Sequence, residues 1–406
     1  MRPGRTWWAG TSILSFAVVI VLGSSMAVAR AGERVSAEPA RPKIGLVLAG
    51  GGAKGAAHVG VLKVLEEMRI PIDVVVGTSM GSIVGGLYAS GMRPDDIERA
   101  IREIDWVDVF EDAPDRADRS FRRKADDALY VFKAKPGFSD GKIKLPLAVV
   151  QGQKFDLELN RLTQGVSAVG DFDKLPIPFR AVAADLETGD QVVLKSGSLP
   201  RALRASMAVP GAFNPVEMDG RLLVDGGIAN NIPVSVAREL GADVLIVSEL
   251  GTDMLTRDEI ESGLDVAAQM VNFLFVINSR QQLKTLAEDD VRISVQLGDI
   301  GAGSFERIRE AIPLGEQAAR VAADKLNRYA LAEAGYRQHV AARSLPRTGP
   351  RQVDFVRIEN RSGVSDEVIA ARLSVKAGEP LDVAELEHDI QQIYGLEIFE
   401  SVRYAL

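Results

Sequence analysis

Ser79 is the residue whose surroundings most clearly suggest chemistry. It lies in Gly77-Thr78-Ser79-Met80-Gly81, the G-x-S-x-G pattern in which a serine occupies a sharp turn between a strand and a helix. The two glycines relieve the crowding of such a turn, so the hydroxyl can stand clear of the backbone. The segment 73–77, with three consecutive valines, and small or apolar residues at 82–89 predict the strand and the helix. Ser79 is therefore our candidate nucleophile.

A glycine-rich turn earlier in the chain is the second feature. Residues 43–49 form an apolar run typical of a strand buried on both faces, and the turn after it reads Gly50-Gly51-Gly52-Ala53-Lys54-Gly55. Unpaired N–H groups where a helix begins can bind an anion. Because the carboxyl ends of parallel strands meet at one edge of a sheet, we expect this turn beside Ser79. That position favours an oxyanion hole.

Two nucleotide-binding interpretations compete for the same turn. Its G-x-G-x-x-G spacing fits a dinucleotide fingerprint, but the acidic residue at the right distance, Asp73, begins its strand and so lies at the opposite end of the sheet. A phosphate-binding loop needs Lys and then Ser or Thr after Gly55, where this chain has Ala56-Ala57. The oxyanion hole is the favoured interpretation.

A serine nucleophile needs a base. The chain has three histidines, His58, His339 and His388, and none is well placed, since His58 is expected to pack or cap on its helix. The best carboxylate is Asp225, which ends an apolar strand immediately before Gly226-Gly227. An Asp-Gly-Gly sequence is also common in ordinary turns. Asp185 is the second choice, and the small loop 206–213, which contains Pro210 and Gly211, is expected to line the same pocket.

Together and in this order, the three motifs resemble the signature of the patatin-like phospholipases, over roughly residues 43–330. The resemblance implies an α/β fold with three α/β/α layers and a mostly parallel central sheet. It also implies a phospholipase A-type serine esterase that acts on phospholipid or another acyl ester and needs no cofactor. The site it implies is a dyad of Ser79 as nucleophile and Asp225 as base, with the backbone of Gly51 and Gly52 as oxyanion donors.

Composition limits the class of protein. With 406 residues, a net charge of −8 and an isoelectric point near 5.2, the chain lacks the basic stripe of a nucleic-acid binder. It has no cysteine, which excludes disulfides, thiolate metal sites and a cysteine nucleophile. We predict no metal site.

Residues 1–31 have the parts of a secretory signal peptide. Arg2 and Arg5 precede an apolar stretch over 13–22, and small residues near Ala29 and Ala31 fit a cleavage site. An uncleaved anchor is the alternative, although the apolar stretch is short for a membrane span. The sequence therefore predicts export to the periplasm, outer membrane or cell surface, with a leader at 32–42.

The main domain is predicted over 43–340, with a linker at 341–351. Within the domain we expect a hairpin over 178–194, a buried strand at 243–248, a core helix over 264–286 and a closing helix over 314–335. The alternative for the helix 264–286 is a lipid or subunit contact. The segment 129–153 is expected to form core strands or, alternatively, a lipid-facing flap.

Residues 352–406 are predicted to form a small α+β unit. Strands are expected at 353–358 and 399–406, and helices should begin after Ser365 and Asp382. This order resembles an incomplete polypeptide-transport-associated (POTRA) domain that lacks one strand. The resemblance implies a Gram-negative envelope protein whose C-terminal unit meets an outer-membrane barrel or a partner chain.

The predictions leave a second class of function open. A secretion-accessory or binding protein of the outer membrane could carry an inactive hydrolase domain, and a nucleotide-binding protein is the third hypothesis. As an enzyme, the protein would act at a membrane surface, and no nucleic acid would be a partner.

Overall fold

The structure is a computed structural model that describes residues 41–114, 137–139, 142–144, 148, 150–251, 254–343, 352–399 and 401–406. The predicted signal peptide and nearly all of the leader lie outside the described residues. So do most of the segment 129–153 and of the linker 341–351. Within the described part of the chain, no helix combines the length and the apolar character needed to cross a bilayer.

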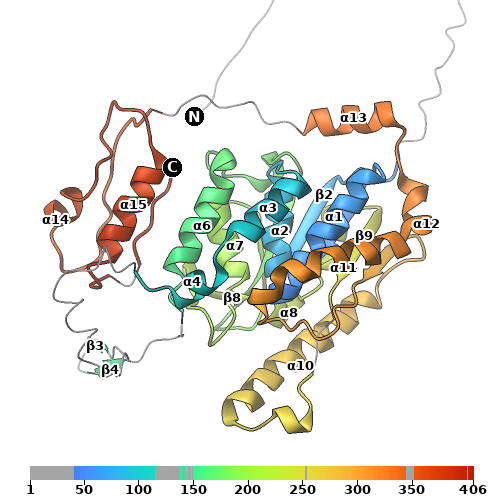
Figure 1. Cartoon of the computed structure of the whole chain (residues 1–406), viewed down its shortest axis with the longest axis horizontal. Coiled ribbons are helices and arrows are strands. Elements are labelled where there is room, and N and C mark those ends of the chain that lie inside the picture. Colours follow the sequence, from blue (N-terminus) through green and yellow to red (C-terminus); the bar gives the residue numbers. More distant parts are fainter. Residues whose placement is uncertain are drawn as a thin grey trace, which may run out of the picture. The chain divides into compact units, whose positions relative to one another are not determined.

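One mixed sheet of eight strands organises the chain (Figure 1). Its strand order is β10-β9-β1-β2-β5-β8-β7, and β6 pairs with β5. The strands are β1 (Ile44–Leu48), β2 (Val74–Thr78), β5 (Phe179–Asp185), β6 (Gln191–Leu194), β7 (Val216–Met218), β8 (Arg221–Asp225), β9 (Val244–Glu249) and β10 (Val291–Ser294). A separate two-stranded hairpin comprises β3 (Gly137–Ser139) and β4 (Lys142–Lys144).

The sheet is less parallel than predicted. The five strands from β10 to β5 are parallel, but β6 and β8 run antiparallel to β5, and β7 runs antiparallel to β8. The reason is local: β7 and β8 are joined by Asp219-Gly220, two residues that both have positive φ. Such a two-residue turn forces the chain straight back as a hairpin. The α/β prediction is confirmed, and the mostly parallel sheet is corrected to a mixed one.

Helices cover both faces of this sheet. Alternate residues of β1 face opposite sides, so that Leu46 and Leu48 join the larger core cluster while Val47 joins the smaller one. The larger cluster includes residues of α1 (Ala57–Glu67), α2 (Met80–Ala89), α3 (Pro94–Glu103), α7 (Leu199–Ser206) and α11 (Ile308–Val321). The smaller cluster takes in α9 (Val234–Glu239). These are the three α/β/α layers that the family resemblance implied.

The remaining helices and connections complete the described part. The α-helices are α4 (Trp106–Glu111), α6 (Gln153–Thr163), α8 (Gly227–Asn230), α10 (Gly263–Leu283), α12 (Ala323–Leu326), α13 (Glu333–Ala342), α14 (Asp366–Ala370) and α15 (Val383–Tyr394). The 3₁₀ turns are η1 (Gly52–Ala56), η2 (Gln164–Val166), η3 (Phe172–Lys174), η4 (Arg257–Glu259), η5 (Phe305–Arg307) and η6 (Asn327–Tyr329).

The helix predicted over 264–286 is present as α10 but is not core. A Ser262–Asp265 capping box begins it, as local sequence favours. Five of its large apolar side chains are exposed, however, because the side that faces the protein carries Asn278 and Gln282, which hydrogen-bond to it. The exposed residues are Val266, Met270, Phe273, Leu274 and Ile277.

The C-terminal segment has the two predicted helices, α14 and α15, but not the two predicted strands. Neither 353–358 nor the described residues at 399 and 401–406 are assigned to a strand. An extended segment becomes a strand only where a neighbour pairs with its backbone. Here the Val353 amide donates to the Glu379 carbonyl and the Val402 amide to the Gln153 side chain, while Phe355 is 73% exposed.

Candidate active site

Ser79 sits in a strained turn between β2 and α2. Its φ and ψ are 54° and −129°, a conformation that few non-glycine residues adopt. The turn is possible because Gly81 has no side chain: a Cβ there would come within 2.4 Å of the carbonyl oxygens of Leu48 and Ala49. This is the geometry of a nucleophile elbow, in which the turn exposes one hydroxyl to the sheet edge.

Asp225 meets Ser79 across the intervening strand β5. Thr78 pairs with Val182, and the next residue of β5, Ala183, pairs with Asp225, so the ends of β2 and β8 reach the same level of the sheet. The Ser79 hydroxyl donates to Asp225 Oδ2 at 2.6 Å, although 146 residues separate the two in sequence. The Gly227 amide donates to the other carboxylate oxygen at 2.8 Å.

Burial dominates the electrostatics of this carboxylate. Asp225 is 1% exposed and Ser79 is 4% exposed. Desolvation raises the pKa of Asp225 to about 6, against the hydrogen bonds from Ser79 and Gly227, which lower it. A carboxylate with a pKa near 6 is ionised at neutral pH and is also basic enough to accept a proton from a hydroxyl during a reaction.

The glycine turn after β1 lies next to this pair. A Cβ on Gly50 would lie 3.1 Å from the Cβ of Ser79. The Gly50 amide donates to the Asn231 carbonyl and the Ala53 amide to the Ala302 carbonyl. Among the described residues, the amides of Gly51 and Gly52 have no acceptor. These two N–H groups are the ones available to an oxygen anion, which matches the pair that the family resemblance implies.

Gly52 has to be glycine for two reasons. Its φ is +56°, and a Cβ would come within 2.2 Å of the Ala302 carbonyl oxygen. Any larger residue would therefore push the turn away from the segment that also receives the Ala53 amide.

Ser206, the last residue of α7, was predicted from the sequence only as part of a loop lining the pocket, without a specific role. Its hydroxyl accepts the Ser79 amide at 2.9 Å and donates to the Val182 carbonyl. The carbonyls of Ser206 and Ala208 accept the amides of Gly226 and Asp225. The segment 206–208 therefore holds the backbones of both Ser79 and Asp225. The small residues Ala205, Ser206 and Ala208 were the available signal, since small residues allow backbones to approach closely.

The remaining titratable candidates lie elsewhere. Both ring nitrogens of His58 are engaged, with the Ser248 hydroxyl and the Ala49 carbonyl. His339 contacts Arg343, and His388 contacts Gln392. Asp185 accepts the Glu187 amide in the turn after β5, two residues beyond the position opposite Asp225. In the part of the chain that the structure describes, no cluster of three His, Asp or Glu side chains could hold a metal ion.

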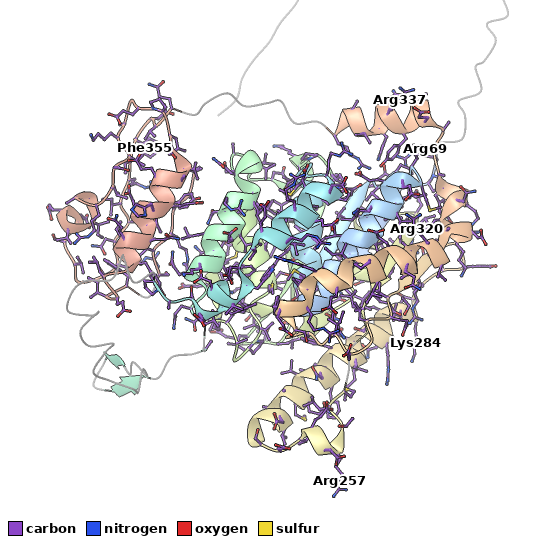
Figure 2. All side chains as sticks on the ribbon, in the orientation of Figure 1. Arg69, Arg257, Lys284, Arg320, Arg337 and Phe355 are labelled. Carbon is purple, nitrogen blue, oxygen red and sulfur yellow. The ribbon has the colours of Figure 1, made fainter. Side chains whose placement is uncertain are left out.

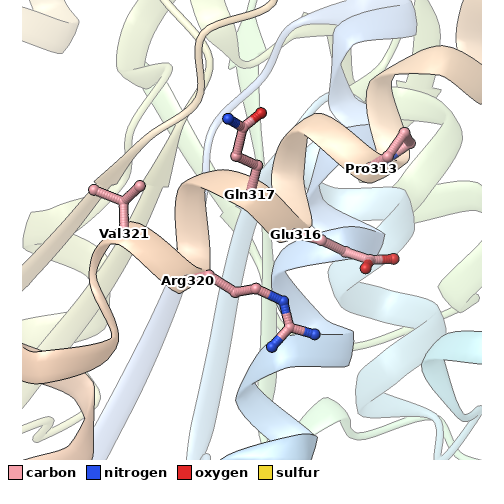
Figure 3. Close-up of a pocket in the computed structure, with 5 residues that line it drawn as sticks. All are labelled: Pro313, Glu316, Gln317, Arg320 and Val321. Carbon is pink, nitrogen blue, oxygen red and sulfur yellow. The ribbon is translucent and has the colours of Figure 1, made fainter.

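A shallow hollow on α11 is unrelated to this arrangement (Figure 3). Pro313, Glu316, Gln317, Arg320 and Val321 line it. Arg320 pairs with Glu67 at the C-terminal end of α1, whereas the glycine turn precedes the N-terminal end of that helix. The hollow therefore lies at the other end of α1 from Ser79.

Comparisons with known proteins agree with the geometry. Residues 46–238 match the family model described as patatin-like phospholipase. The chain is 35% identical over 235 residues to a patatin-like phospholipase domain-containing protein of Caenorhabditis elegans, which covers 56% of this chain and 15% of that protein. It is 34% identical over 226 residues to the human patatin-like phospholipase domain-containing protein 6, covering 54% of this chain and 14% of that protein.

The match to a bacterial relative covers similar shares of both chains. An uncharacterized NTE family protein of Mycobacterium tuberculosis is 34% identical over 209 residues, which are 52% of this chain and 49% of that protein. The chain thus spans between about one seventh and one half of the length of these relatives. Among solved structures, VipD from Legionella pneumophila has a TM-score of 0.37 and 17% identity, covering 70% of this chain and 67% of VipD. That likeness is too distant to bear on function.

Proposed function

Because residues 46–238 match the model of the patatin-like phospholipase family, we propose that the chain is a member of that family and a phospholipase A-type serine esterase. The observation that carries the proposal is the 2.6 Å hydrogen bond from the Ser79 hydroxyl to a buried carboxylate, next to two unpaired amides. The substrate is a phospholipid or another acyl ester. No cofactor takes part in the proposed reaction.

The reaction proceeds in two halves. Ser79 Oγ attacks the acyl carbonyl carbon while its proton passes to Asp225, and the amides of Gly51 and Gly52 stabilise the negative oxygen that forms. The ester bond breaks, Asp225 returns the proton to the leaving alcohol, and the acyl group stays on Ser79. Water then attacks the acyl-enzyme, Asp225 takes its proton, and the fatty acid leaves as Ser79 regains a proton.

Replacement of Ser79 and Asp225 tests the proposal. We expect Ser79→Ala and Asp225→Asn each to lower kcat on short-chain and phospholipid esters by about 10³-fold or more, because each removes a group that takes part in every turnover. Ser90→Ala is a matched control, since the hydroxyl of Ser90, directly after α2, donates to the carbonyl of Gly86 one turn earlier, away from Asp225. Activity that survives in Ser79→Ala would contradict the nucleophile assignment. A folded wild-type protein that cleaves no acyl ester would favour the binding or secretion-accessory alternative.

We also propose that α10 brings the site to a lipid surface. No charged residue occurs between Val266 and Ser279, and five large apolar side chains of this stretch are exposed. Charged residues stand beyond both ends of the stretch, among them Arg257 and Lys284 (Figure 2). An exposed apolar surface of this kind is typical of proteins that bind other proteins or membranes.

The opposite face of α10 supports this role. Asn278 accepts the Asn231 amide at 2.9 Å and donates to the Gly227 carbonyl at 2.8 Å. The ring of Phe275 lies 3.0 Å from where a Cβ on Gly227 would stand. The apolar face thus belongs to a helix that packs on the residues next to Asp225, so a lipid bound there is close to the proposed chemistry.

Export to the cell envelope is part of the same proposal. It is supported by the signal-like composition of residues 1–31 and by the POTRA-like order of the C-terminal sequence. Mass spectrometry of the mature N-terminus tests it, and we expect the chain to begin near residue 30 or 32.

A further inference from the structure

His58 is a fully buried polar residue that the proposed reaction does not use. It lies in the first turn of α1 and is 0% exposed. Nε2 lies 2.8 Å from the Ala49 carbonyl oxygen, and Nδ1 lies 2.9 Å from the Ser248 hydroxyl. The ring therefore links three segments: the end of β1, the end of β9 and the beginning of α1.

These contacts define the protonation state of the ring. A carbonyl oxygen can only accept, so Nε2 carries the hydrogen and donates it to Ala49. In the neutral ring Nδ1 is then an acceptor, and the Ser248 hydroxyl donates to it. Burial lowers the pKa of His58 to about 4, so the ring stays neutral over the range in which Asp225 is ionised. His58 acts as a fixed donor to one carbonyl.

That carbonyl belongs to the peptide bond that leads into the glycine turn. The Ala49 amide donates to the Ser248 carbonyl at 3.1 Å, which ends the ladder between β1 and β9. The next peptide has its carbonyl held by His58 and its N–H, that of Gly50, held by the Asn231 carbonyl at 3.1 Å. Both polar groups of the Ala49–Gly50 peptide are thus fixed from opposite sides. The following two amides are those of Gly51 and Gly52.

We propose that His58 is a positioning residue for the oxyanion hole, which fixes the plane of the Ala49–Gly50 peptide and thereby aims the amides of Gly51 and Gly52 at the acyl oxygen. The inference rests on the proposed esterase function. An oxyanion hole stabilises the transition state only if its donors are already oriented when the negative charge develops. Loss of the hydrogen bond from His58 to the Ala49 carbonyl should therefore lower kcat more than it raises KM.

The test compares substitutions that keep or remove the donor. In His58→Gln the side-chain amide can still donate to the Ala49 carbonyl, whereas His58→Leu fills similar space without a donor. Ser248→Ala leaves the ring but removes the group that holds Nδ1. His388→Leu is the matched control, because His388 is exposed and contacts only its helix neighbour Gln392 among the described residues. All are assayed at pH 8 with a soluble butyrate ester.

We expect kcat of His58→Leu to fall about 10- to 100-fold, with KM changed less than about 2-fold, since one misplaced oxyanion donor costs up to about 10³-fold. His58→Gln should recover most of the activity, and Ser248→Ala should lie between the two. An alkyl trifluoromethyl ketone, which forms an oxyanion on the serine, should lose affinity by the same factor as kcat. An ether phospholipid, which has no acyl carbonyl, should bind as it does to the wild type.

Other results overturn the inference. These are an unchanged kcat in His58→Leu, or an equal loss of affinity for the ketone and the ether lipid, which would indicate a general structural role. If His58→Leu does not fold, the same measurements are made on Ser248→Ala: kcat, and affinity for the ketone compared with affinity for the ether lipid. Ser79→Ala separates the two proposals: if it keeps wild-type activity the esterase mechanism fails, and if it is inactive while His58→Leu is unaffected only the role of His58 fails.

Discussion

At the residue scale, the proposed mechanism relies on burial, and not on a histidine, to make Asp225 basic enough to accept the proton of Ser79. A solvated aspartate, with a pKa near 3.9, would be too weak a base at neutral pH. Desolvation raises the pKa of Asp225 more than the hydrogen bonds from Ser79 and Gly227 lower it, so the pKa rises to about 6. The same burial brings the hydroxyl and the carboxylate to 2.6 Å in a site from which water is largely excluded.

This raised pKa predicts the pH dependence of the reaction. The base works only when it is ionised, so kcat/KM should be half-maximal near pH 6, rise with pH and level off above about pH 7. An unshifted carboxylate would instead give a midpoint near pH 4. Initial rates with a soluble ester between pH 3.5 and 9 measure the midpoint, and a value near 4 would contradict the assigned cause.

Ser206 offers a second prediction at this scale. Its hydroxyl satisfies the Ser79 amide and the Val182 carbonyl, both buried. Ser206→Ala leaves both groups without their partner, so the free energy of unfolding should fall by about 1–3 kcal/mol. Because the Ser79 turn is strained, kcat should fall as well. Urea unfolding and esterase rates measure the two effects. Ser90→Ala, which removes a hydroxyl bonded to the Gly86 carbonyl, should change the free energy of unfolding and kcat much less.

At the element scale, α1 and α11 pack closely against each other. Because α1 begins directly after the glycine turn, this contact fixes the helix that follows the turn. A Cβ on Gly315 would lie 1.8 Å from the Ala57 carbonyl oxygen, and one on Gly60 would lie 2.0 Å from the Ile312 carbonyl oxygen. The two helices therefore meet backbone to backbone (Figure 1). Ala57 begins α1, directly before His58.

Gly315→Ala should push α11 away from α1. We expect the free energy of unfolding to fall by about 1–3 kcal/mol, because the added methyl cannot be placed without a backbone shift. Gly335→Ala is the matched control on α13. Its methyl would approach nothing closer than 4.0 Å, and helix propensity should make it neutral or stabilising by up to about 1 kcal/mol. Thermal unfolding of both variants decides, and equal stability of the two would contradict the packing argument.

The exposed face of α10 gives the second element-scale prediction. Met270→Gln combined with Ile277→Gln should weaken binding to phosphatidylcholine vesicles by about 10-fold or more, because each side chain is more than half exposed and would enter the bilayer. Cleavage of a soluble ester should change little. Val321→Gln on α11, a residue 84% exposed, is the matched control. Unchanged vesicle binding would contradict the lipid-surface proposal. A lower mass of the double variant than of the wild type in solution would indicate that a second copy of the chain covers this face of α10.

At the scale of the whole molecule, the sheet brings together four distant segments. The turn at Gly50, the elbow at Ser79, the segment 206–208 and Asp225 come from both the parallel and the antiparallel parts of the sheet. The hairpin of β7 and β8 returns the chain so that Asp225 ends opposite Ala183. A fully parallel sheet would have required a longer crossover before Asp225.

The proposed mechanism predicts how the molecule responds to removal of metals and to reduction. Ser79, Asp225 and two backbone amides supply the nucleophile, the base and the anion site, so no step passes through a metal ion. EDTA at millimolar concentration should leave kcat/KM unchanged within about 2-fold. Dithiothreitol should also have no effect, because the chain has no cysteine. Loss of activity with EDTA that returns with added calcium would contradict the mechanism.

Much of the sheet could be predicted from local pattern. The predicted strands at 43–49, 73–77 and 243–248 and the hairpin over 178–194 all form strands of the main sheet. The proximity of Ser79 to Asp225 was predictable as well, since each ends a strand beside glycine. The sequence also indicated α10, but not which of its faces is buried. Apolar spacing normally marks the buried side, yet here hydrogen bonds of Asn278 and Gln282 hold the polar side against the protein.

The sequence by itself determined the order of the motifs, the strands that carry them and the absence of cysteine chemistry, because these follow from residue type and short-range spacing. Only the tertiary structure decided which amides of the glycine turn are unpaired and that Ser206 holds the elbow. It alone placed His58 against the Ala49 carbonyl and turned the apolar face of α10 outward. The physical reason is that each of these depends on hydrogen bonds and desolvation between groups far apart in the chain, whose partners no local pattern specifies.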